Sequence, residues 1–251
     1  MAEVDLNADL GEDFGVYRLA CDEQILAYVT SANLACGMHA GDPVAMARSV
    51  GLAKAKGVAI GAHPGYPDLQ GFGRRDMALD EDEIHAFVLY QLGALAAFAR
   101  AQGVRLHHVK PHGALYNRAA VDRAAARAIC RAVAEFDPSL KLYAPYRSEL
   151  AQQAEWMGLC ACCEVFADRR YEADGRLTPR RHPDALIRDL DEACEQVLTM
   201  VKEGRVRART GEWVEVTVDT VCLHGDGPHA IELAKALHRR LTEAGVRIRP
   251  A

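Results

Sequence analysis

The sequence DLNADLGE, residues 5–12, alternates polar and apolar side chains along most of its length. Successive side chains of a β-strand point to opposite faces, so Asp5, Asn7 and Asp9 share one face and the residues between them share the other. A solvent-exposed edge would give the same alternation. On an inward face, however, polar side chains are costly to bury unless they have partners or a task. We therefore predict that Val4–Asp9 is a barrel strand whose polar face serves a function.

Six more short apolar or alternating runs follow along the chain, and each precedes a helical pattern or a loop that leads to one. This alternation is typical of repeated βα units. Half of the 251 residues are hydrophobic and no linker interrupts them, so we expect a single domain over residues 1–251. The expected strands after the first are Ser31–Cys36, Val58–Ala62, Leu106–Lys110, Leu140–Ala144, Leu159–Phe166 and Thr220–His224.

Two architectures are compatible with this alternation, a doubly wound open sheet and a closed barrel. Polar residues follow nearly every expected strand, and all strand ends meet at one mouth only in a closed barrel. We therefore predict an α/β fold that is a single incomplete or distorted (β/α) barrel of about seven strands. Two alternating segments within Arg205–Val218, on either side of Thr210 and Gly211, predict a β-hairpin inserted before the last strand.

Helix starts are marked locally. Asp42 followed by Pro43 predicts the start of one helix. Asp80 with Glu83 predicts an acidic variant of a capping box at the start of another. These signals place helices after the second and third expected strands, as a βα repeat requires.

Composition excludes several classes of partner. The formal net charge is -5, and no basic stripe interleaved with aromatic residues is present, so we expect no nucleic acid partner. Apolar stretches such as Leu92–Ala99 are much shorter than the roughly 20 residues needed to cross a bilayer, so we expect no membrane contact. The first ten residues lack the basic and apolar regions of a secretory signal. A cytoplasmic protein is the resulting expectation.

The first three units carry candidate functional residues directly after their strands. Asp9 and Glu12 follow the first strand, and Asn33 and His39 lie at the end of the second, among glycines that let backbone approach a ligand. Asp42 in the same loop is more simply a helix cap. His63 ends the third strand, which is otherwise apolar. A histidine in this position is typical of a catalytic or ligand-binding residue.

The fourth unit places Lys110 at the end of an apolar strand, with His112 close behind. A lysine there can neutralise an anionic substrate or act with a lowered pKa. We expect Lys110 to lie at the C-terminal mouth of the barrel and to contact a substrate carboxylate or phosphate. On this interpretation, replacement of Lys110 by methionine should leave the fold intact.

The last two units add further polar residues. Asp168 and Arg169 follow the sixth strand, where structural ion pairing could also account for them. His224 ends the last strand, and Asp226 lies between two glycines before the next helix. The segment lacks G-x-G-x-x-G, so it does not predict a dinucleotide site.

Six segments taken together closely resemble the LamB/YcsF family, in the right order and over nearly the whole chain from Val4. The resemblance implies a barrel related to the glycoside hydrolase/deacetylase superfamily. The segments are DLNADLGEDFG (5–15), TSANLACGMHAGDP (30–43), GAHPGYPDLQGFGRR (61–75), VKPHGALYN (109–117), EVFADRRYEADGRLTPR (164–180) and TVCLHGDGP (220–228).

The resemblance also implies an activity. The chain would be the A subunit of an ATP-dependent 5-oxoprolinase, in which 5-oxoproline, ATP with Mg²⁺, and water give glutamate, ADP and phosphate. Two partner subunits, B and C, would complete the enzyme. The sequence contains no G-x-x-x-x-G-K-[ST] loop, so this chain shows no recognisable means of binding ATP alone. Whether it also forms a homo-oligomer stays open.

On this interpretation, proton transfers would come from the acids and histidines of the strand ends, with Lys110 as their electrostatic partner. Their individual roles stay open. The expected catalytic residues are Asp9, His39, His63, Lys110, His112, His224 and Asp226, and the expected substrate-binding residues are Asn7, Glu12, Asn33, Lys110, Asp168 and Arg169.

Related deacetylases use an Asp/His/His metal site, for which Asp9, His39 and His63 are the candidates here. Phosphate activation would already make the lactam carbonyl electrophilic, so we expect acid–base catalysis with no obligatory metal. Two alternatives remain. One is a metal-dependent amide or N-acyl hydrolase that acts without ATP. The other is a carbohydrate- or metabolite-binding barrel without turnover.

Overall fold

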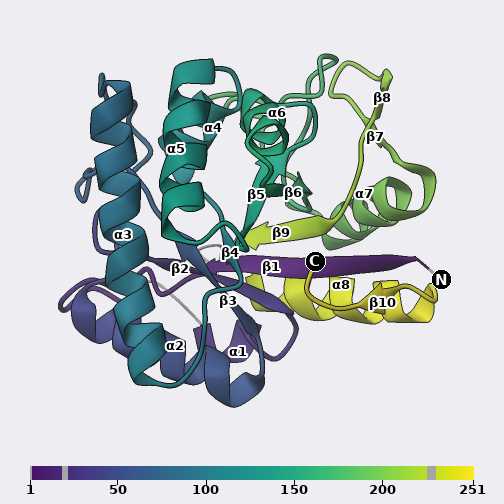
Figure 1. The fold of residues 1–251 in the computed structure, drawn as a ribbon. Coiled ribbons are helices and arrows are strands. Elements are labelled where there is room, and N and C mark those ends of the chain that lie inside the picture. Colours follow the sequence, from purple (N-terminus) through teal and green to yellow (C-terminus); the bar gives the residue numbers. More distant parts are fainter. Residues whose placement is uncertain (1, 19–21, 225–229) are drawn as a thin grey trace.

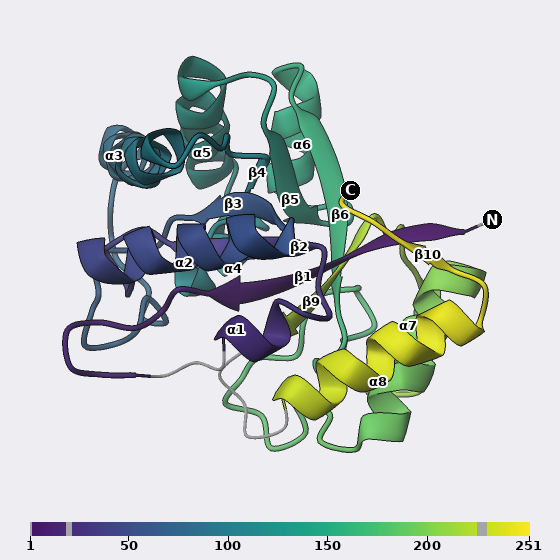
Figure 2. The same cartoon turned by 90° about the horizontal axis from the view of Figure 1, so that it is seen from below.

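The structure is a computed structural model that describes residues 2–18, 22–224 and 230–251. Seven parallel strands of this part form a closed barrel, because β9 pairs with both β6 and β1. Figures 1 and 2 show the helices arranged outside these strands. The barrel strands are β1 (Glu3–Leu10), β2 (Ser31–Ala35), β3 (Ala59–His63), β4 (His108–Val109), β5 (Lys141–Pro145), β6 (Cys160–Phe166) and β9 (Thr220–His224).

The closed barrel of seven strands confirms the predicted architecture and excludes the open doubly wound sheet. All seven expected strands are present, each within two residues of its predicted start and one of its predicted end. The predicted hairpin is also present, as an antiparallel pair of β7 (Arg205–Arg207) and β8 (Trp213–Glu215). It lies between α7 and β9, outside the barrel.

The helices follow the strands as a βα repeat requires. Asp42 caps α2 by accepting hydrogen bonds from the Val44 and Ala45 amides, and Asp80 and Glu83 form the predicted capping box of α3. The helices are α1 (Asp22–Ile25), α2 (Pro43–Lys56), α3 (Glu81–Ala101), α4 (Gly113–Ala119), α5 (Arg123–Phe136), α6 (Glu149–Trp156), α7 (Leu190–Glu203) and α8 (Ala230–Glu243).

The polar face of β1 points into the barrel. Leu6 and Ala8 are buried in the hydrophobic core. Asp5, on the opposite face, is also buried, and its carboxylate accepts hydrogen bonds from four hydroxyl groups at 2.6–2.9 Å. Four donors offset much of the cost of burying this charge. They belong to Thr30, Ser31, Tyr143 and Thr220.

α3 is long and apolar enough to cross a membrane by length and composition alone. The prediction from the sequence rested on uninterrupted apolar stretches such as Leu92–Ala99, whereas this helix qualifies through its mean hydropathy of 1.3. Its residues Ile84, Val88, Leu92 and Leu95 are buried, and it packs against α2, α5 and β3. A core helix of a globular barrel has these properties, so the finding is weak support for a membrane span.

Candidate functional site

The C-terminal ends of the barrel strands bring most of the predicted residues together. In the parallel register, Asp9 lies opposite Asn33 of β2 on one side and opposite the backbone of His224 on the other. His63 ends β3, and Lys110 and His112 follow β4. The side chain of His224 and the whole of Asp226 lie outside the described residues. The mouth of the barrel is therefore where sequence reasoning expected the site.

Lys110 lies at the centre of a buried ion-pair network and is only 2% exposed. Its Nζ donates to Asp9 Oδ1 at 2.9 Å and to Cys222 Sγ at 2.9 Å, and it lies 2.9 Å from Glu164 Oε1. Burial alone would lower the pKa of Lys110, but Asp9, with Cys222 and Glu164, holds this pKa well above its ordinary value. This environment favours the charged form of Lys110, in contrast to the lowered pKa considered from the sequence.

Asn7 and Asn33 orient the two acids of this network. Asn33 Nδ2 donates to Asp9 Oδ1 at 2.8 Å and to Asn7 Oδ1 at 2.7 Å. Asn7 Nδ2 in turn donates to Glu164 Oε1 at 3.0 Å. Both asparagines are buried. Their amide groups are engaged within the protein, so a role in holding Asp9 and Glu164 is visible, and the predicted substrate contact stays a prediction.

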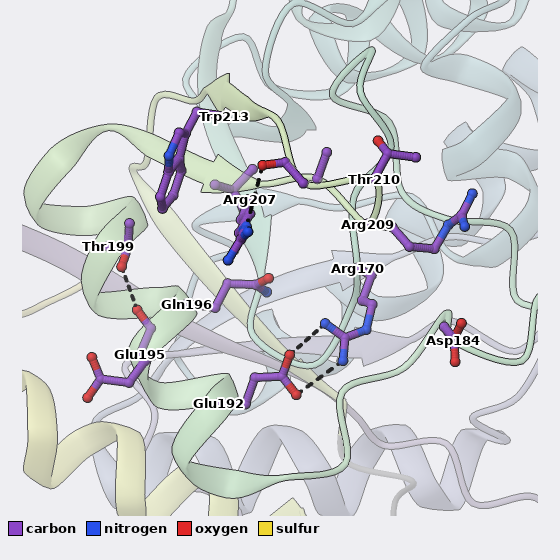
Figure 3. A pocket seen from close by; sticks show the side chains of 13 residues that line it. Arg170, Asp184, Glu192, Glu195, Gln196, Thr199, Arg207, Arg209, Thr210 and Trp213 are labelled. Atoms are coloured by element: carbon purple, nitrogen blue, oxygen red, sulfur yellow. Dashed lines mark hydrogen bonds and ion pairs between the residues drawn. The ribbon is translucent and has the colours of Figure 1, made fainter.

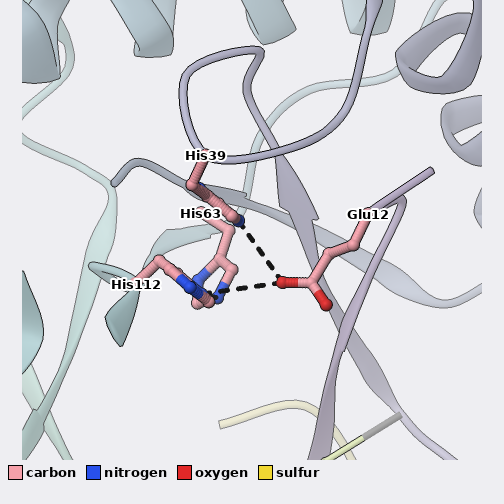
Figure 4. A group of neighbouring side chains, drawn as sticks. All are labelled: Glu12, His39, His63 and His112. Atoms are coloured by element: carbon pink, nitrogen blue, oxygen red, sulfur yellow. Dashed lines mark hydrogen bonds and ion pairs between the residues drawn. The ribbon is translucent and has the colours of Figure 1, made fainter. Parts of the chain in front are cut away.

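Glu12, His39, His63 and His112 form a second buried cluster beside this network (Figure 4). One ligand atom from each lies within 4.8 Å of the others. Glu12 Oε1 is 3.3 Å from His39 Nε2 and 3.6 Å from His112 Nδ1, and Asp9 Oδ2 is 3.4 Å from His63 Nε2. Asp9 therefore connects the histidine cluster to Lys110.

His63 and His112 face each other through two nitrogens that lack protons in the neutral rings. His63 Nδ1 donates to the Lys110 carbonyl at 2.7 Å, and His112 Nε2 donates to the Phe72 carbonyl at 2.8 Å, because a carbonyl only accepts. The remaining nitrogens, His63 Nε2 and His112 Nδ1, are 2.9 Å apart. Two lone pairs at this distance repel each other. This close contact is favourable only when a proton or a cation lies between the two nitrogens.

His39 completes the cluster as a neutral ring. It stacks on His112 with ring centroids 3.7 Å apart, and its Nε2 faces the accepting carboxylate of Glu12. Burial, and then the charge of His63, lowers the pKa of His39 well below its ordinary value. Within the described residues, His39 Nδ1 has no hydrogen-bond partner. Gly73, at φ 62°, packs on this stack so closely that a Cβ there would lie 2.8 Å from His39 and His112.

The four residues fit a divalent metal in donor type and spacing. Tetrahedral sites with bonds of about 2.0–2.1 Å have ligand atoms about 3.4 Å apart. The separations of 2.9, 3.3 and 3.6 Å between these donors are close to that value. Carbonyl acceptors orient His63 and His112, as is usual for metal-binding histidines. Of the predicted metal ligands, His39 and His63 belong to this group, and the structure adds Glu12 and His112. Asp9, the third predicted ligand, forms an ion pair with Lys110 instead.

Asp168 and Arg169 follow β6. Arg169 is buried, and its Nη2 donates to the Thr178 carbonyl at 2.7 Å. Sequence reasoning missed Glu164, Tyr116 and Cys222 as site residues. Glu164 and Cys222 lie within barrel strands. The alternation of side chains along these strands places both residues on the inward face, and this alternation is the sequence signal that could have identified them.

A separate groove of about 650 Å³ lies between α7 and the inserted hairpin (Figure 3). Its lining includes Arg170, Arg209 and the half-exposed Trp213. Arg170 makes two hydrogen bonds to Glu192, at 2.6 and 3.1 Å. Arg209 likewise pairs with Glu172. These charges are satisfied locally, so the described lining of the groove offers no buried unpaired group comparable to those at the barrel mouth.

Comparison with known proteins agrees with the fold and the strand-end residues. The model of the LamB/YcsF family matches residues 4–251. The chain belongs to the LamB/YcsF family. This confirms the resemblance seen in the six sequence segments, and the match extends over the inserted hairpin and the last helix as well.

Relatives that are similar over their full length include a protein from Tolumonas auensis that is named as the A subunit of 5-oxoprolinase. It is 56% identical over 249 residues, which are 99% of each chain. A crystal structure of a lactam utilization protein from Thermus thermophilus is 50% identical with a TM-score of 0.95 and covers 99% of this chain and 100% of that one.

A polysaccharide deacetylase from Bacillus cereus shares the fold alone. It is 12% identical with a TM-score of 0.54, and the match covers 100% of this chain and 92% of that one. The predicted relation to deacetylase-like barrels is confirmed at this level.

Proposed function

We propose that this chain is the A subunit of a 5-oxoprolinase and opens the lactam of 5-oxoproline to glutamate. The observation that carries the proposal is the full-length similarity, at 56% identity, to a protein that bears that name. The buried cation and histidine cluster at the barrel mouth supply groups suited to that chemistry. Because the reaction consumes ATP, we place it in the cytoplasm.

The lactam of 5-oxoproline is an unreactive amide. Phosphorylation of its carbonyl oxygen by ATP with Mg²⁺ would make the carbon electrophilic and provide phosphate as a leaving group. Water then attacks the carbon and the ring nitrogen leaves with a proton, which opens the ring to the acyl phosphate of glutamate. A second water then displaces the phosphate and gives glutamate. These steps require a base for the water, an acid for the nitrogen and a positive charge for the developing anion.

The described residues can be assigned to these tasks. Lys110 stabilises negative charge on the lactam oxygen or its phosphate. His63 and His112 share one proton across their 2.9 Å contact, and Asp9 and Glu12 balance it. Burial, and then the charge of His39, lowers the pKa of His112 well below its ordinary value, so His112 is suited to start as a neutral base. His112 then accepts a proton and His63 donates one. His224 and Asp226 remain proposed members of this site.

A metal ion bound at the histidine cluster would change this mechanism. Glu12, His39, His63 and His112 would hold it, and it would supply Lewis-acid polarisation and a more acidic bound water. We expect protein that is stripped of transition metals and returned to Mg²⁺ to keep its turnover, because phosphate activation already makes the carbonyl electrophilic. Elemental analysis of untagged protein and assay before and after chelation measure this. Stoichiometric metal, with activity regained only on its return, would overturn it.

Partner subunits B and C complete the proposed enzyme. We expect the chain alone, supplied with ATP and Mg²⁺, to release no glutamate from isotope-labelled 5-oxoproline, since its sequence lacks a P-loop. Addition of both partners should give turnover. Glutamate production by the chain with ATP but without partners would contradict this division of labour.

The same assay tests the second candidate, a metal-dependent amide hydrolase. The donor set of Glu12 and three histidines favours it as the alternative. Ring opening of the labelled substrate without ATP, dependent on an added transition metal, would identify that activity.

A further inference from the structure

Three buried polar atoms, on residues that interact electrostatically with Cys222, have no hydrogen-bond partner within the described part of the chain. They are Tyr116 Oη, Glu164 Oε2 and Arg169 Nε. The three side chains belong to residues that are 5%, 3% and 5% exposed. A buried polar group without a partner typically costs about 1–3 kcal/mol, and more when it is charged. Such groups are rare in native proteins, so a set of three calls for an explanation.

The three residues share Cys222 as a neighbour, and Cys222 contacts Lys110. Tyr116, Phe166 and Cys222 form a small apolar cluster separate from the main core. Lys110 Nζ contacts Cys222 Sγ at 2.9 Å and Glu164 Oε1 at 2.9 Å. The unpaired oxygen of Glu164 is therefore the second oxygen of a carboxylate that already contacts the proposed catalytic lysine.

Tyr116 and Glu164 lie within hydrogen-bonding reach of each other, yet neither Tyr116 Oη nor Glu164 Oε2 has a hydrogen bond of normal geometry among the described residues. Burial, and then the Glu164 carboxylate, raises the pKa of Tyr116 well above its ordinary value. Tyr116 thus keeps its proton. A hydroxyl that remains protonated can donate to an acceptor, and its oxygen can accept as well. The pair offers one acceptor on Glu164 and one donor on Tyr116.

Arg169 is a buried cation whose hydrogen bond from Nη2 goes to a neutral group, the Thr178 carbonyl. Burial, and then the charge of Arg180, lowers the pKa of Arg169 to about 10, so the guanidinium is still charged at neutral pH. Its Nε–H is free to donate. A guanidinium in this state is suited to a carboxylate, to which it can donate two parallel hydrogen bonds.

The three groups correspond to one edge of 5-oxoproline. Along that edge the molecule carries the carboxylate on Cα, then the ring N–H, and then the lactam carbonyl. Arg169 is suited to the carboxylate and Glu164 Oε2 to the N–H. Lys110, whose three N–H groups already face Asp9, Cys222 and Glu164, offers its positive charge to the carbonyl oxygen. The contact between Glu164 and Lys110 places the last two groups side by side, as the substrate requires.

We propose that Tyr116, Glu164 and Arg169 form the subsite that recognises the carboxylate and N–H edge of the lactam substrate. Arg169 donates to the carboxylate, Glu164 Oε2 accepts from the ring N–H, and Tyr116 donates to the same carboxylate. This assignment rests on the proposed function and explains how the barrel selects a lactam that carries a carboxylate. Buried water that satisfies the same atoms is the rival explanation.

The test compares 5-oxoproline with its carboxamide in the complex reconstituted with both partners. We expect Arg169→Met to raise KM for 5-oxoproline about 10- to 100-fold, the range for loss of a hydrogen bond to a charged group. The preference for the acid over the amide should fall by the same factor. Arg169→Lys, which keeps the charge but loses Nε–H, should lie between Arg169→Met and wild type. Arg170→Met is the matched control, because the neighbouring Arg170 pairs with Glu192 outside the mouth.

The ratio of the two substrates separates recognition from folding, since a folding defect lowers both activities equally. Glu164→Gln should raise KM for both substrates and keep the preference for the acid within about threefold, because the amide retains the ring N–H. Tyr116→Phe removes a neutral donor to the carboxylate, so it should lower the preference for the acid, but by less than Arg169→Met. An Arg169→Met enzyme with wild-type KM or wild-type preference would overturn the subsite. Absence of 5-oxoproline turnover by the wild-type complex would instead overturn the proposed function.

Discussion

Replacement of Lys110 by methionine is expected to lower turnover of the reconstituted enzyme by about 10²–10³-fold, the typical effect of removing one stabilising group from a developing anion. It is also expected to destabilise the fold by about 3–5 kcal/mol, because removal of one partner leaves buried charges uncompensated. The charges concerned are Asp9 and Glu164, each 2.9 Å from Lys110 Nζ. Chemical denaturation and steady-state kinetics measure the two effects.

A double variant separates these effects. Glu164→Gln removes one of the two carboxylates that Lys110→Met would leave unpaired, so the pair of changes should recover part of the lost stability and none of the lost turnover. The sequence alone predicts an intact fold for Lys110→Met, because the lysine is expected at an open mouth. The burial of Lys110 between two acids reverses that expectation. A single variant with wild-type stability or near wild-type turnover would contradict the role given to the network.

The barrel was predictable because its strands carry their pattern locally. Polar and apolar residues alternate in β1, and apolar runs of about five residues mark most other strands. Asp42 and Asp80 mark helix starts through short-range capping bonds. α1 and β10 (Arg247–Ile248) were missed, because segments of four and two residues are too short to show a period.

The positions of the site residues were predictable, but their contacts were not. A residue that follows a barrel strand reaches the mouth whatever its partners are, so His39, His63, Lys110 and His112 could be identified one by one. Their pairings join residues up to 112 positions apart, as in the contact from Lys110 to Cys222. Such pairings depend on the closed barrel and leave no local pattern.

The partners of the two asparagines could not be predicted from the sequence either. Their polarity on an inward face suggests ligand binding, yet in the structure Asn7 and Asn33 hydrogen-bond to Glu164 and Asp9. Glu164 itself lies in an alternating strand whose ion pairs could be structural, and only its unpaired Oε2 distinguishes it. A missing hydrogen bond is visible in three dimensions only.

The last expectation concerns the facing histidines. His63→Ala and His112→Ala should each lower turnover by about 10²–10⁴-fold, the range for loss of a positioned acid or base. In the proposed mechanism the two rings share one proton across their 2.9 Å contact, so the double variant should be hardly worse than either single variant. His107→Ala, before β4 at the opposite end of the barrel, is the matched control and should stay near wild type.

Losses that multiply in the double variant would mean that His63 and His112 act independently, and would contradict the shared proton. A common metal ion would also make the losses non-additive, so the variants must be analysed for bound metal alongside the kinetics. If wild type and His107→Ala carry stoichiometric metal that both site variants lose, the coupling belongs to a cation held by the cluster. If none of them carries it, the two lone pairs 2.9 Å apart leave a proton as the group that joins the rings.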